Sequence, residues 1–346
     1  MGTFQNVPIS FSPVVSFRKM SYCYFEKCIT VISTERSEWR NLNNMFTKFE
    51  QIYAELKGRG TRKRMVAAWG VDSHTVAAAG KAVELGLADV TLVGDEVLIA
   101  AACKEEGVEI SNFTIVHNPS ELSAVAQAVQ MIRDGEGDFL MKGLCSTDKF
   151  LRAILNKETG LLPPKGTLTH CTTLEIPAYH KLLFVGDVAV IPAPDLKQKQ
   201  VIMECLVKTA KAVGVETPKV AILAATEQVL PSQPASLEAA LLAKMADRGQ
   251  IKGCIADGPL ALDVAIDMES VQIKGLASPV AGDADCILFP NIESGNVFYK
   301  ANSKLVPGVR QSGILVGAKV PCVLSSRADS IDTKLNSIAI AAMSVK

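Results

Sequence analysis

The alternation of strands and helices predicts an α/β protein with parallel strands. From residue 65 onward, short apolar runs alternate with amphipathic segments at a spacing of about 25 residues, which is the pattern of βα units. Hydrophobic residues make up 48% of the chain but aromatic residues only 5%, which suits this class better than an all-β sandwich. The length of 346 residues allows one large or two smaller domains, each with its own core.

The first helix of the predicted fold begins just after Met45. Its apolar residues share one face, and glycines at 58 and 60 end it. We then expect strands at 65–70, 89–94, 114–118, 138–143, 173–177, 181–187, 219–225, 254–260, 286–290 and 320–325. We expect helices at 75–88, 95–107, 119–137, 195–214, 236–249 and 331–343. Residues 156–171, rich in glycine and proline, are expected to form a loop or a domain crossing.

Residues 1–44 differ from the rest of the chain in aromatic content and in hydrophobic periodicity. They hold seven of the 19 aromatic residues and show neither helical nor strand periodicity. We expect a poorly ordered extension, or the product of an overlong gene model whose true start is Met45. The alternative is a short amphipathic or partner-binding extension.

Charge and cysteine content argue against several classes of protein. Thirty-six basic residues balance 36 acidic ones, whereas a nucleic-acid or anionic-membrane binder needs an excess of Lys and Arg. No apolar run reaches the length of a membrane span, and we see no secretory signal. The nine scattered cysteines form no CxxC pair, which is typical of the reduced thiols of a cytoplasmic protein.

Polar residues that follow predicted strands are the first candidates for chemistry, because ligands of parallel α/β sheets gather at strand C-termini. Lys142 and Gly143 end one strand, where an ammonium and backbone amides can approach an anion. The competing interpretation is a plain turn with a solvated lysine. His170 adjoins Cys171, but strand neighbours point to opposite faces, so we expect no Cys–His dyad. The alternative for His170 is a structural histidine at a strand start.

A later segment predicts an anion pocket more directly. Ser294, Gly295 and Asn296 follow the strand at 286–290 and should open a helix, with amides and short polar side chains presented there. Lys300 lies four residues beyond Asn296 and therefore on the same helical face. An ordinary helix start is the alternative interpretation.

The last predicted strand leads into Ser326, Arg327 and Asp329. A guanidinium can bind two phosphate oxygens at once, so this segment is a natural anion clamp. The alternative is an arginine in a structural salt bridge.

Four aspartates in the second half of the chain are the only candidates for a divalent metal: Asp263, Asp267, Asp283 and Asp285. Helix capping and surface charge explain them better, so we expect no metal. The motifs of zinc hydrolases, serine hydrolases, Walker A loops and Rossmann dehydrogenases are absent from the sequence.

Taken in order, four stretches resemble the phosphate acetyl/butyryl transferase family, and more closely its butyryl branch. They are PKVAILAATE (218–227), KMADRGQIKGCIADGPLALDVAI (244–266), SPVAGDADCILFPNIESGNVFYK (278–300) and GAKVPCVLSSRADSIDTKLNSIAIAAM (317–343). The resemblance covers roughly residues 45–346.

The resemblance implies two parallel-sheet α/β domains with an interdomain cleft, of the isocitrate/isopropylmalate dehydrogenase type. Residues 45–160 and 316–346 would form the first domain, and residues 161–315 the second. It also implies a homodimer or a higher homo-oligomer.

The implied reaction converts an acyl-CoA and phosphate into an acyl phosphate and CoA, with no metal, cofactor or covalent intermediate. Ser326 would hydrogen-bond the CoA sulfur, and Arg327 would hold phosphate or polarise the acyl carbonyl. The acetyl branch has a catalytic aspartate six residues after its arginine, where this chain has Thr333. Asp332 or Asp329 could therefore serve as the base.

Two segments depart from the family pattern, at 186–192 and 226–240. They support a second interpretation, a weak or inactive relative that binds acyl-CoA in a regulatory role. A third interpretation, a decarboxylating dehydrogenase of the same overall fold, would need a metal-binding Asp trio that the sequence does not convincingly supply.

Overall fold

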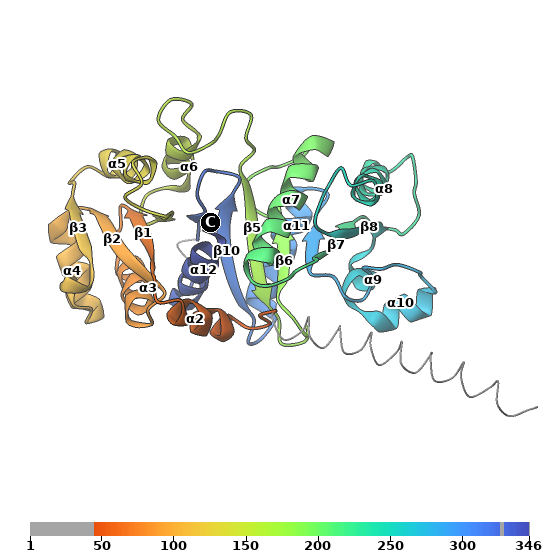
Figure 1. Ribbon diagram of the computed structural model, residues 1–346, viewed down its shortest axis with the longest axis horizontal. Coiled ribbons are helices and arrows are strands. Elements are labelled where there is room, and N and C mark those ends of the chain that lie inside the picture. The colour runs from red at the N-terminus through yellow and green to blue at the C-terminus, as the bar shows by residue number, and fades with distance from the viewer. Residues whose placement is uncertain (1–44, 326–328, 346) are drawn as a thin grey trace, which may run out of the picture. The chain divides into compact units, whose positions relative to one another are not determined.

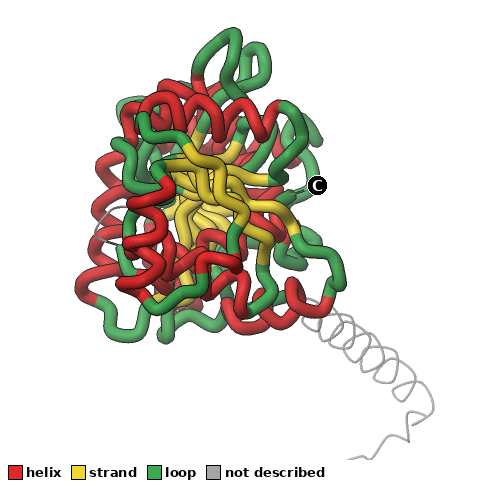
Figure 2. The backbone as a smooth tube through the Cα atoms, turned by 90° about the vertical axis from the view of Figure 1, so that its left-hand side faces the viewer, coloured by secondary structure: helices red, strands yellow, loops and turns green. Residues whose placement is uncertain are grey.

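A mixed β-sheet with helices on both faces organises the chain (Figures 1 and 2). The computed structural model describes residues 45–325 and 329–345; the prediction for residues 1–44 lies outside them. Phe46–Lys346 form one compact unit. The strands are β1 (Lys63–Ala68), β2 (Ala88–Gly94), β3 (Thr114–His117), β4 (Phe139–Lys142), β5 (Thr169–Glu175), β6 (Leu183–Gly186), β7 (Lys219–Leu223), β8 (Ile255–Leu260), β9 (Cys286–Leu288), β10 (Arg310–Val316) and β11 (Cys322–Val323).

The α-helices surround this sheet. They are α2 (Phe49–Gly58), α3 (Ser73–Glu84), α4 (Glu96–Glu106), α5 (Glu121–Arg133), α6 (Thr147–Leu155), α7 (Leu196–Ala212), α8 (Pro234–Asp247), α9 (Leu262–Ile266), α10 (Met268–Lys274), α11 (Ile292–Leu305) and α12 (Ile331–Ser344). One short 3₁₀ turn, Ile110–Asn112, precedes β3. In the described part of the chain, no helix is long and apolar enough to cross a membrane.

The predicted strand–helix alternation is confirmed along most of the chain. Asp95 caps α4, because its carboxylate accepts from the amides of Val97 at 2.8 Å and Leu98 at 3.2 Å. Asp72 caps α3 in the same way, through the amide of Thr75 at 3.0 Å. Four elements, α6, α9, α10 and β10, were not expected from the sequence.

The expectation of wholly parallel sheets is wrong at the centre of the sheet. The strand order is β3-β2-β1-β4-β11-β10-β5-β6-β9-β7-β8. β10 runs antiparallel to both β11 and β5, and β5 runs antiparallel to β6. The short connections at 317–321 and 176–182 explain the β10–β11 and β5–β6 pairings, since a parallel crossover needs a dozen or so residues.

Strands therefore reach the centre of the sheet from two opposite directions. Val323, at the end of β11, pairs with Ile314 of β10, which in turn pairs with Cys171 of β5. On the other side of β5, Val185 near the end of β6 pairs with Thr172. The C-terminal ends of β4 and β11 thus lie opposite the C-terminal end of β6, at the level of the first residues of β5.

Two hydrophobic cores pack along this sheet. The first joins residues of β1, β4, α5 and α6 with Leu315, Cys322 and Leu324 from the end of the chain. The second is built from residues of β5 to β9, from Leu174 to Phe289. Helix α12 packs against α2, α3 and β10. The C-terminal segment therefore shares a core with the first half of the chain, while the two-domain division stays a prediction.

The Asp283 carboxylate anchors the start of β6 and β7. It lies 2.8 Å from His180 Nε2, 2.8 Å from Lys181 Nζ and 2.6 Å from Lys219 Nζ. Lys181 is buried and also contacts Asp285 at 2.7 Å. Burial by itself would raise the pKa of Asp283, but the hydrogen bonds from Lys181 and Lys219 outweigh burial and hold that pKa well below its ordinary range.

We predict that Asp283→Asn lowers the melting temperature at neutral pH. A depressed folded-state pKa stabilises the fold above the unfolded pKa of about 3.9, and this contribution disappears as the pH falls below that value. The loss should be a few degrees, at about 2–4 °C per kcal/mol for a chain of this size. Thermal melts from pH 7 to pH 3 should show the difference from wild type shrinking below about pH 4. Asp247→Asn, which removes an exposed ion pair with Lys244, is the control. A difference in melting temperature between Asp283→Asn and wild type that stays constant from pH 7 to pH 3 would contradict the prediction.

Candidate active site

A cavity of about 540 Å³ opens where the two sets of strand ends meet. Its walls come from the end of β4, the start of α6, the start of β5, the loop after β6, helix α11 and the segment after β11. The lining residues are Lys142, Ser146, Thr147, His170, Val188, Ala189, Asn296, Tyr299, Lys300, Leu324, Ser325 and Asp329.

Five residues singled out from the sequence lie together in this lining. They come from four separate stretches of the chain: Lys142, His170, Asn296, Lys300 and Asp329. The expectation that Asn296 and Lys300 share a helical face is confirmed, since both line the cavity from α11. The structure thus brings together most of the anion-binding groups that the sequence suggested.

The two predicted glycines, Gly143 and Gly295, serve close packing beside the cavity. A Cβ on Gly143 would lie 2.1 Å from the carbonyl oxygen of Trp69. A Cβ on Gly295 would lie 2.4 Å from the carbonyl oxygen of Asp187. Any larger residue at either position would force the cavity walls apart.

Ser294 and Asp332 lie outside the cavity lining. The Ser294 hydroxyl donates to the carbonyl oxygen of Asn291 at 2.9 Å. Asn291 is the N-cap of α11, so Ser294 belongs to the helix cap. The Asp332 carboxylate lies 3.4 Å from Lys81 Nζ, and its side chain is 67% exposed. Ser326 and Arg327 lie outside the described residues, between Ser325 and Asp329, which both line the cavity.

The buried carboxylate of Asp187 holds two walls of the cavity together. One oxygen accepts from Thr169 Oγ1 at 2.7 Å and from the His170 amide at 3.2 Å. The other accepts from the amides of Ala189 at 2.7 Å and Val190 at 2.9 Å. With four hydrogen bonds the buried charge is fully satisfied, and the start of β5 and the loop after β6 are fixed to one another.

A second hydrogen bond ties α11 to the same loop. Asn296 Nδ2 donates to the carbonyl oxygen of Val188 at 2.9 Å. Asn296 therefore sets the distance between the helix that carries Lys300 and the loop that carries Val188 and Ala189.

Lys142 is a buried cation at the end of β4. Its side chain is only 3% exposed, and Nζ donates to the carbonyl oxygens of Gly143 at 3.1 Å and Cys145 at 3.0 Å. These bonds hold the ammonium at the turn between β4 and α6, where Ser146 caps the helix by accepting from the Lys149 amide at 3.3 Å. The sequence-based alternative of a solvated lysine is therefore wrong.

Two aromatic rings shape the electrostatics of the cavity. Burial lowers the pKa of His170, and attraction to Asp187 opposes this only in part. Burial raises the pKa of the Tyr299 phenol, and the nearby charge of Asp329 raises it further. Both side chains are therefore neutral polar walls at neutral pH, and Tyr299 Oη accepts from Gln311 Nε2 at 3.0 Å.

Sequence reasoning missed Asp187, Tyr299 and Ser325. Asp187 follows an apolar strand run, which is a usable signal, but it lies in the segment 186–192 that departs from the family pattern. Tyr299 directly precedes Lys300 on the helix that was singled out. Ser325 falls in the predicted strand 320–325, whereas β11 in the structure ends two residues earlier, at Val323.

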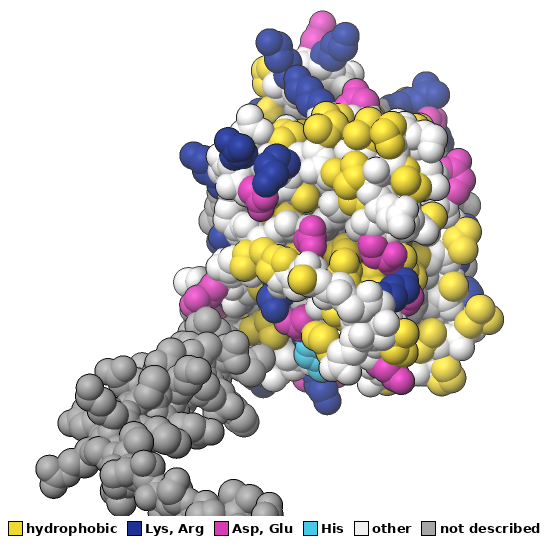
Figure 3. Space-filling model, turned by 90° about the vertical axis from the view of Figure 1, so that its right-hand side faces the viewer, with side chains coloured by type: hydrophobic (Ala, Val, Ile, Leu, Met, Phe, Trp, Pro, Cys, Tyr) yellow, Lys and Arg dark blue, Asp and Glu magenta, His cyan; other side chains and the backbone are white. Residues whose placement is uncertain are grey.

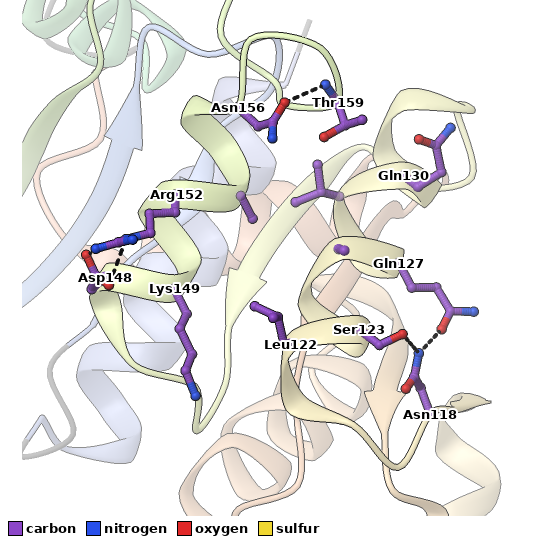
Figure 4. Close-up of a pocket in the computed structure, with 13 residues that line it drawn as sticks. Asn118, Leu122, Ser123, Gln127, Gln130, Asp148, Lys149, Arg152, Asn156 and Thr159 are labelled. Atoms are coloured by element: carbon purple, nitrogen blue, oxygen red, sulfur yellow. Dashed lines mark hydrogen bonds and ion pairs between the residues drawn. The ribbon is translucent and has the colours of Figure 1, made fainter.

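A second, separate cavity of about 840 Å³ lies between α5 and α6 (Figure 4). Asp148, Lys149 and Arg152 line it from α6, beyond the first residues of that helix that line the active-site cavity. Its polar groups satisfy each other: Asn118 Nδ2 donates to Ser123 at 3.0 Å and to Gln127 at 2.7 Å. Arg152 pairs with Asp148.

The four aspartates considered for a metal are engaged elsewhere. Asp263 pairs with Lys274 at 2.9 Å, and Asp267 caps α10. Asp283 and Asp285 both contact Lys181. Over residues 45–325 and 329–345, no group of three or more His, Cys, Asp or Glu side chains is arranged to hold a metal ion.

Comparison with known proteins identifies the family. The family described as phosphate acetyl/butaryl transferase matches residues 117–342. A phosphate butyryltransferase from Clostridium acetobutylicum is 44% identical over 299 residues, which cover 86% of this chain and 98% of that protein. The chain belongs to this family. It is a phosphate acyltransferase, an enzyme that moves acyl groups between coenzyme A and phosphate.

Two further relatives of the enzyme agree with this. A phosphate acetyltransferase from Thermotoga maritima is 41% identical over 285 residues, 82% of this chain and 96% of that protein. The crystal structure of a branched-chain phosphotransacylase from Enterococcus faecalis matches with a TM-score of 0.72 at 28% identity, covering 82% of this chain and 99% of that one. The resemblance found in the sequence is therefore confirmed.

We predict that His170 titrates with a midpoint below the ordinary histidine value. Its pKa lies below the ordinary value of 6.5 because the ring is buried, so protonation there would cost more than in water. The chain has only 4 histidines, so His170 can be assigned in a histidine-labelled NMR spectrum by comparison with His170→Gln. A His170 signal that titrates with a midpoint of about 6.5 or above would contradict the prediction.

Proposed function

We propose that this enzyme transfers a short-chain acyl group, with butyryl as the preferred one, reversibly between coenzyme A and inorganic phosphate in the 540 Å³ cavity. The observation that carries the proposal is the lining of that cavity, which combines Lys142 and Lys300 with the carboxylate of Asp329 and with apolar side chains. Cations suit phosphate, apolar walls suit an acyl chain, and a carboxylate suits a proton transfer.

The chemistry needs two anionic substrates held side by side. A phosphate oxygen attacks the thioester carbonyl, a carbon–oxygen bond forms, and the carbon–sulfur bond breaks. The proton of the hydrogen phosphate ends on the CoA sulfur, so the reaction balances without a further reactant. Orienting the two substrates can lower the barrier by as much as about 7–11 kcal/mol, and positive groups near the carbonyl stabilise the oxyanion that develops there.

The proton carrier in this proposal is Asp329. It lines the cavity, whereas Asp332 lies on the surface beside Lys81. By resemblance to the family, Ser326 hydrogen-bonds the CoA sulfur and Arg327 holds phosphate or polarises the carbonyl. The position of Asp329, two residues after Arg327, supports its role in the same segment of chain.

The acyl chain in this proposal lies against Val188, Ala189 and Leu324, beside the Tyr299 ring. Val188 is almost fully buried, at 1% exposed, and its loop is held by Asp187. A wall fixed in this way limits the length and branching of the chain that fits.

We further propose that the reaction needs neither metal nor cofactor, because lysines of the cavity lining supply the positive charge. The fold would be of the isocitrate/isopropylmalate dehydrogenase type, with two domains meeting at the cavity; the two hydrophobic cores support this division.

The cysteines of the described residues are unpaired thiols, most of them buried. This is in keeping with a proposed cytoplasmic location, where thiols stay reduced.

We propose that the enzyme assembles as a homodimer or a larger homo-oligomer. Figure 3 shows hydrophobic side chains gathered on the side of the molecule where α8 and the edge strand β8 lie. Leu237 and Leu241 on α8 are 39% and 45% exposed, and Ile255 on β8 is 39% exposed. An apolar edge strand favours burial against a second copy, and light scattering of the native enzyme measures the assembly directly.

An assay of acyl transfer tests the proposed function. Phosphate-dependent thiol release should be measured with acetyl-, propionyl-, butyryl- and isobutyryl-CoA, each with and without EDTA. We predict the highest kcat/KM for butyryl-CoA and no effect of EDTA. Binding of acyl-CoA without any phosphate-dependent thiol release would favour the inactive regulatory relative instead.

We predict that Asp329→Asn and Asp332→Asn separate the two candidate bases. Asp329→Asn should lower kcat by about a hundredfold or more, the contribution typical of a positioned general base. Asp332→Asn should stay within about twofold of wild type, because an exposed ion pair contributes little. Steady-state kinetics with butyryl-CoA and phosphate make the comparison. The reverse order of effects would move the base to Asp332.

A further inference from the structure

Lys334 is a buried cation directly behind the cavity wall. It lies on α12, is 4% exposed, and its Nζ lies 3.1 Å from the hydroxyl oxygen of Ser325. Ser325 is itself buried and lines the cavity. The pair thus connects an interior ammonium to the surface that faces the substrates.

The charge of Lys334 has no ion-pair partner among the described residues. Burial lowers the pKa of Lys334, while the more distant carboxylates of Asp72 and Asp329 oppose that fall. A buried charge without a close counter-ion is costly, so an anion bound in the adjoining cavity would complement it.

The hydrogen bond between the two residues has only one possible direction. An ammonium carries donors and no acceptor, so Ser325 Oγ must accept from Lys334. The hydroxyl proton of Ser325 is then left to be donated elsewhere. Within the part of the chain that is described, Ser325 Oγ makes no other hydrogen bond, and the cavity lies beside it.

We propose that the Ser325 hydroxyl donates a hydrogen bond to an oxygen of the substrate phosphate, and that Lys334 is the positioning residue that holds Ser325 as a donor. The proposal rests on the proposed function, in which phosphate is the acyl acceptor. Phosphate is favoured over the thioester carbonyl because it carries negative charge before the reaction begins, whereas the carbonyl is neutral. Only a charged ligand complements the ammonium of Lys334 in the bound state.

Calorimetric titration of inorganic phosphate into the full chain tests this without turnover. Wild type, Ser325→Ala, Lys334→Met and the double variant should be compared. Each single variant should weaken phosphate binding about tenfold, as expected for one lost hydrogen bond to a charged group. The double variant should bind no worse than Ser325→Ala, because Lys334 acts through Ser325. In steady-state assays, KM for phosphate should rise while KM for butyryl-CoA stays unchanged.

Two further variants separate positioning from a general loss of structure. Lys199→Met removes another buried lysine, which pairs with Glu238 and does not line the cavity; it should lower the melting temperature and leave phosphate affinity unchanged. Ser325→Thr keeps the hydroxyl and should retain most of the affinity that Ser325→Ala loses.

Three results would overturn the proposal. They are unchanged phosphate affinity in Ser325→Ala, additive losses in the double variant, and a fall in kcat at saturating phosphate with an unchanged dissociation constant. The last result would place the donor on the carbonyl oxygen. A wild-type enzyme that binds phosphate through this pair but releases no thiol would refute the proposed function and leave this proposal standing.

Discussion

The run of antiparallel pairings from β11 through β10 and β5 to β6 is the constraint on which the site depends. Ile314 of β10 pairs with Val323 on one side and with Cys171 on the other. These two pairings leave β5 running in the same direction as β11, and the antiparallel pairing of β5 with β6 then reverses the strand direction. The C-terminal ends of β4 and β11 therefore meet that of β6. Because side chains that follow strands gather at strand C-termini, groups from distant stretches of sequence converge on one cavity rather than on two opposite edges.

Buried charged side chains whose hydrogen bonds are satisfied then hold the cavity walls in place. Asp187 accepts four hydrogen bonds from two walls, and Lys142 donates to two carbonyls at the turn after β4. Gly143 and Gly295 allow the backbone beside the cavity to approach the carbonyl oxygens of Trp69 and Asp187 closely. Charged groups held in this way need little rearrangement when an anion binds, which is the condition for electrostatic catalysis.

The sequence predicted those site residues best that directly follow a strand or share one face of a helix. Lys142, Asn296 and Lys300 were found in this way, since a turn and a helix face can be inferred from neighbouring residues. Asp187 and Ser325 were missed because their roles depend on partners far along the chain. Asp187 bonds across to Thr169, and Ser325 is oriented by a lysine of α12.

The sequence by itself determined the α/β class, most helices and strands, and the family, because hydrophobic periodicity and local motifs are short-range properties. It did not determine that the sheet is mixed, since strand direction depends on which strands pair after the chain folds. It left Asp329 and Asp332 equivalent as candidate bases. Only the tertiary structure distinguishes their positions, with Asp329 in the cavity lining and Asp332 beside Lys81 on the exposed side of α12.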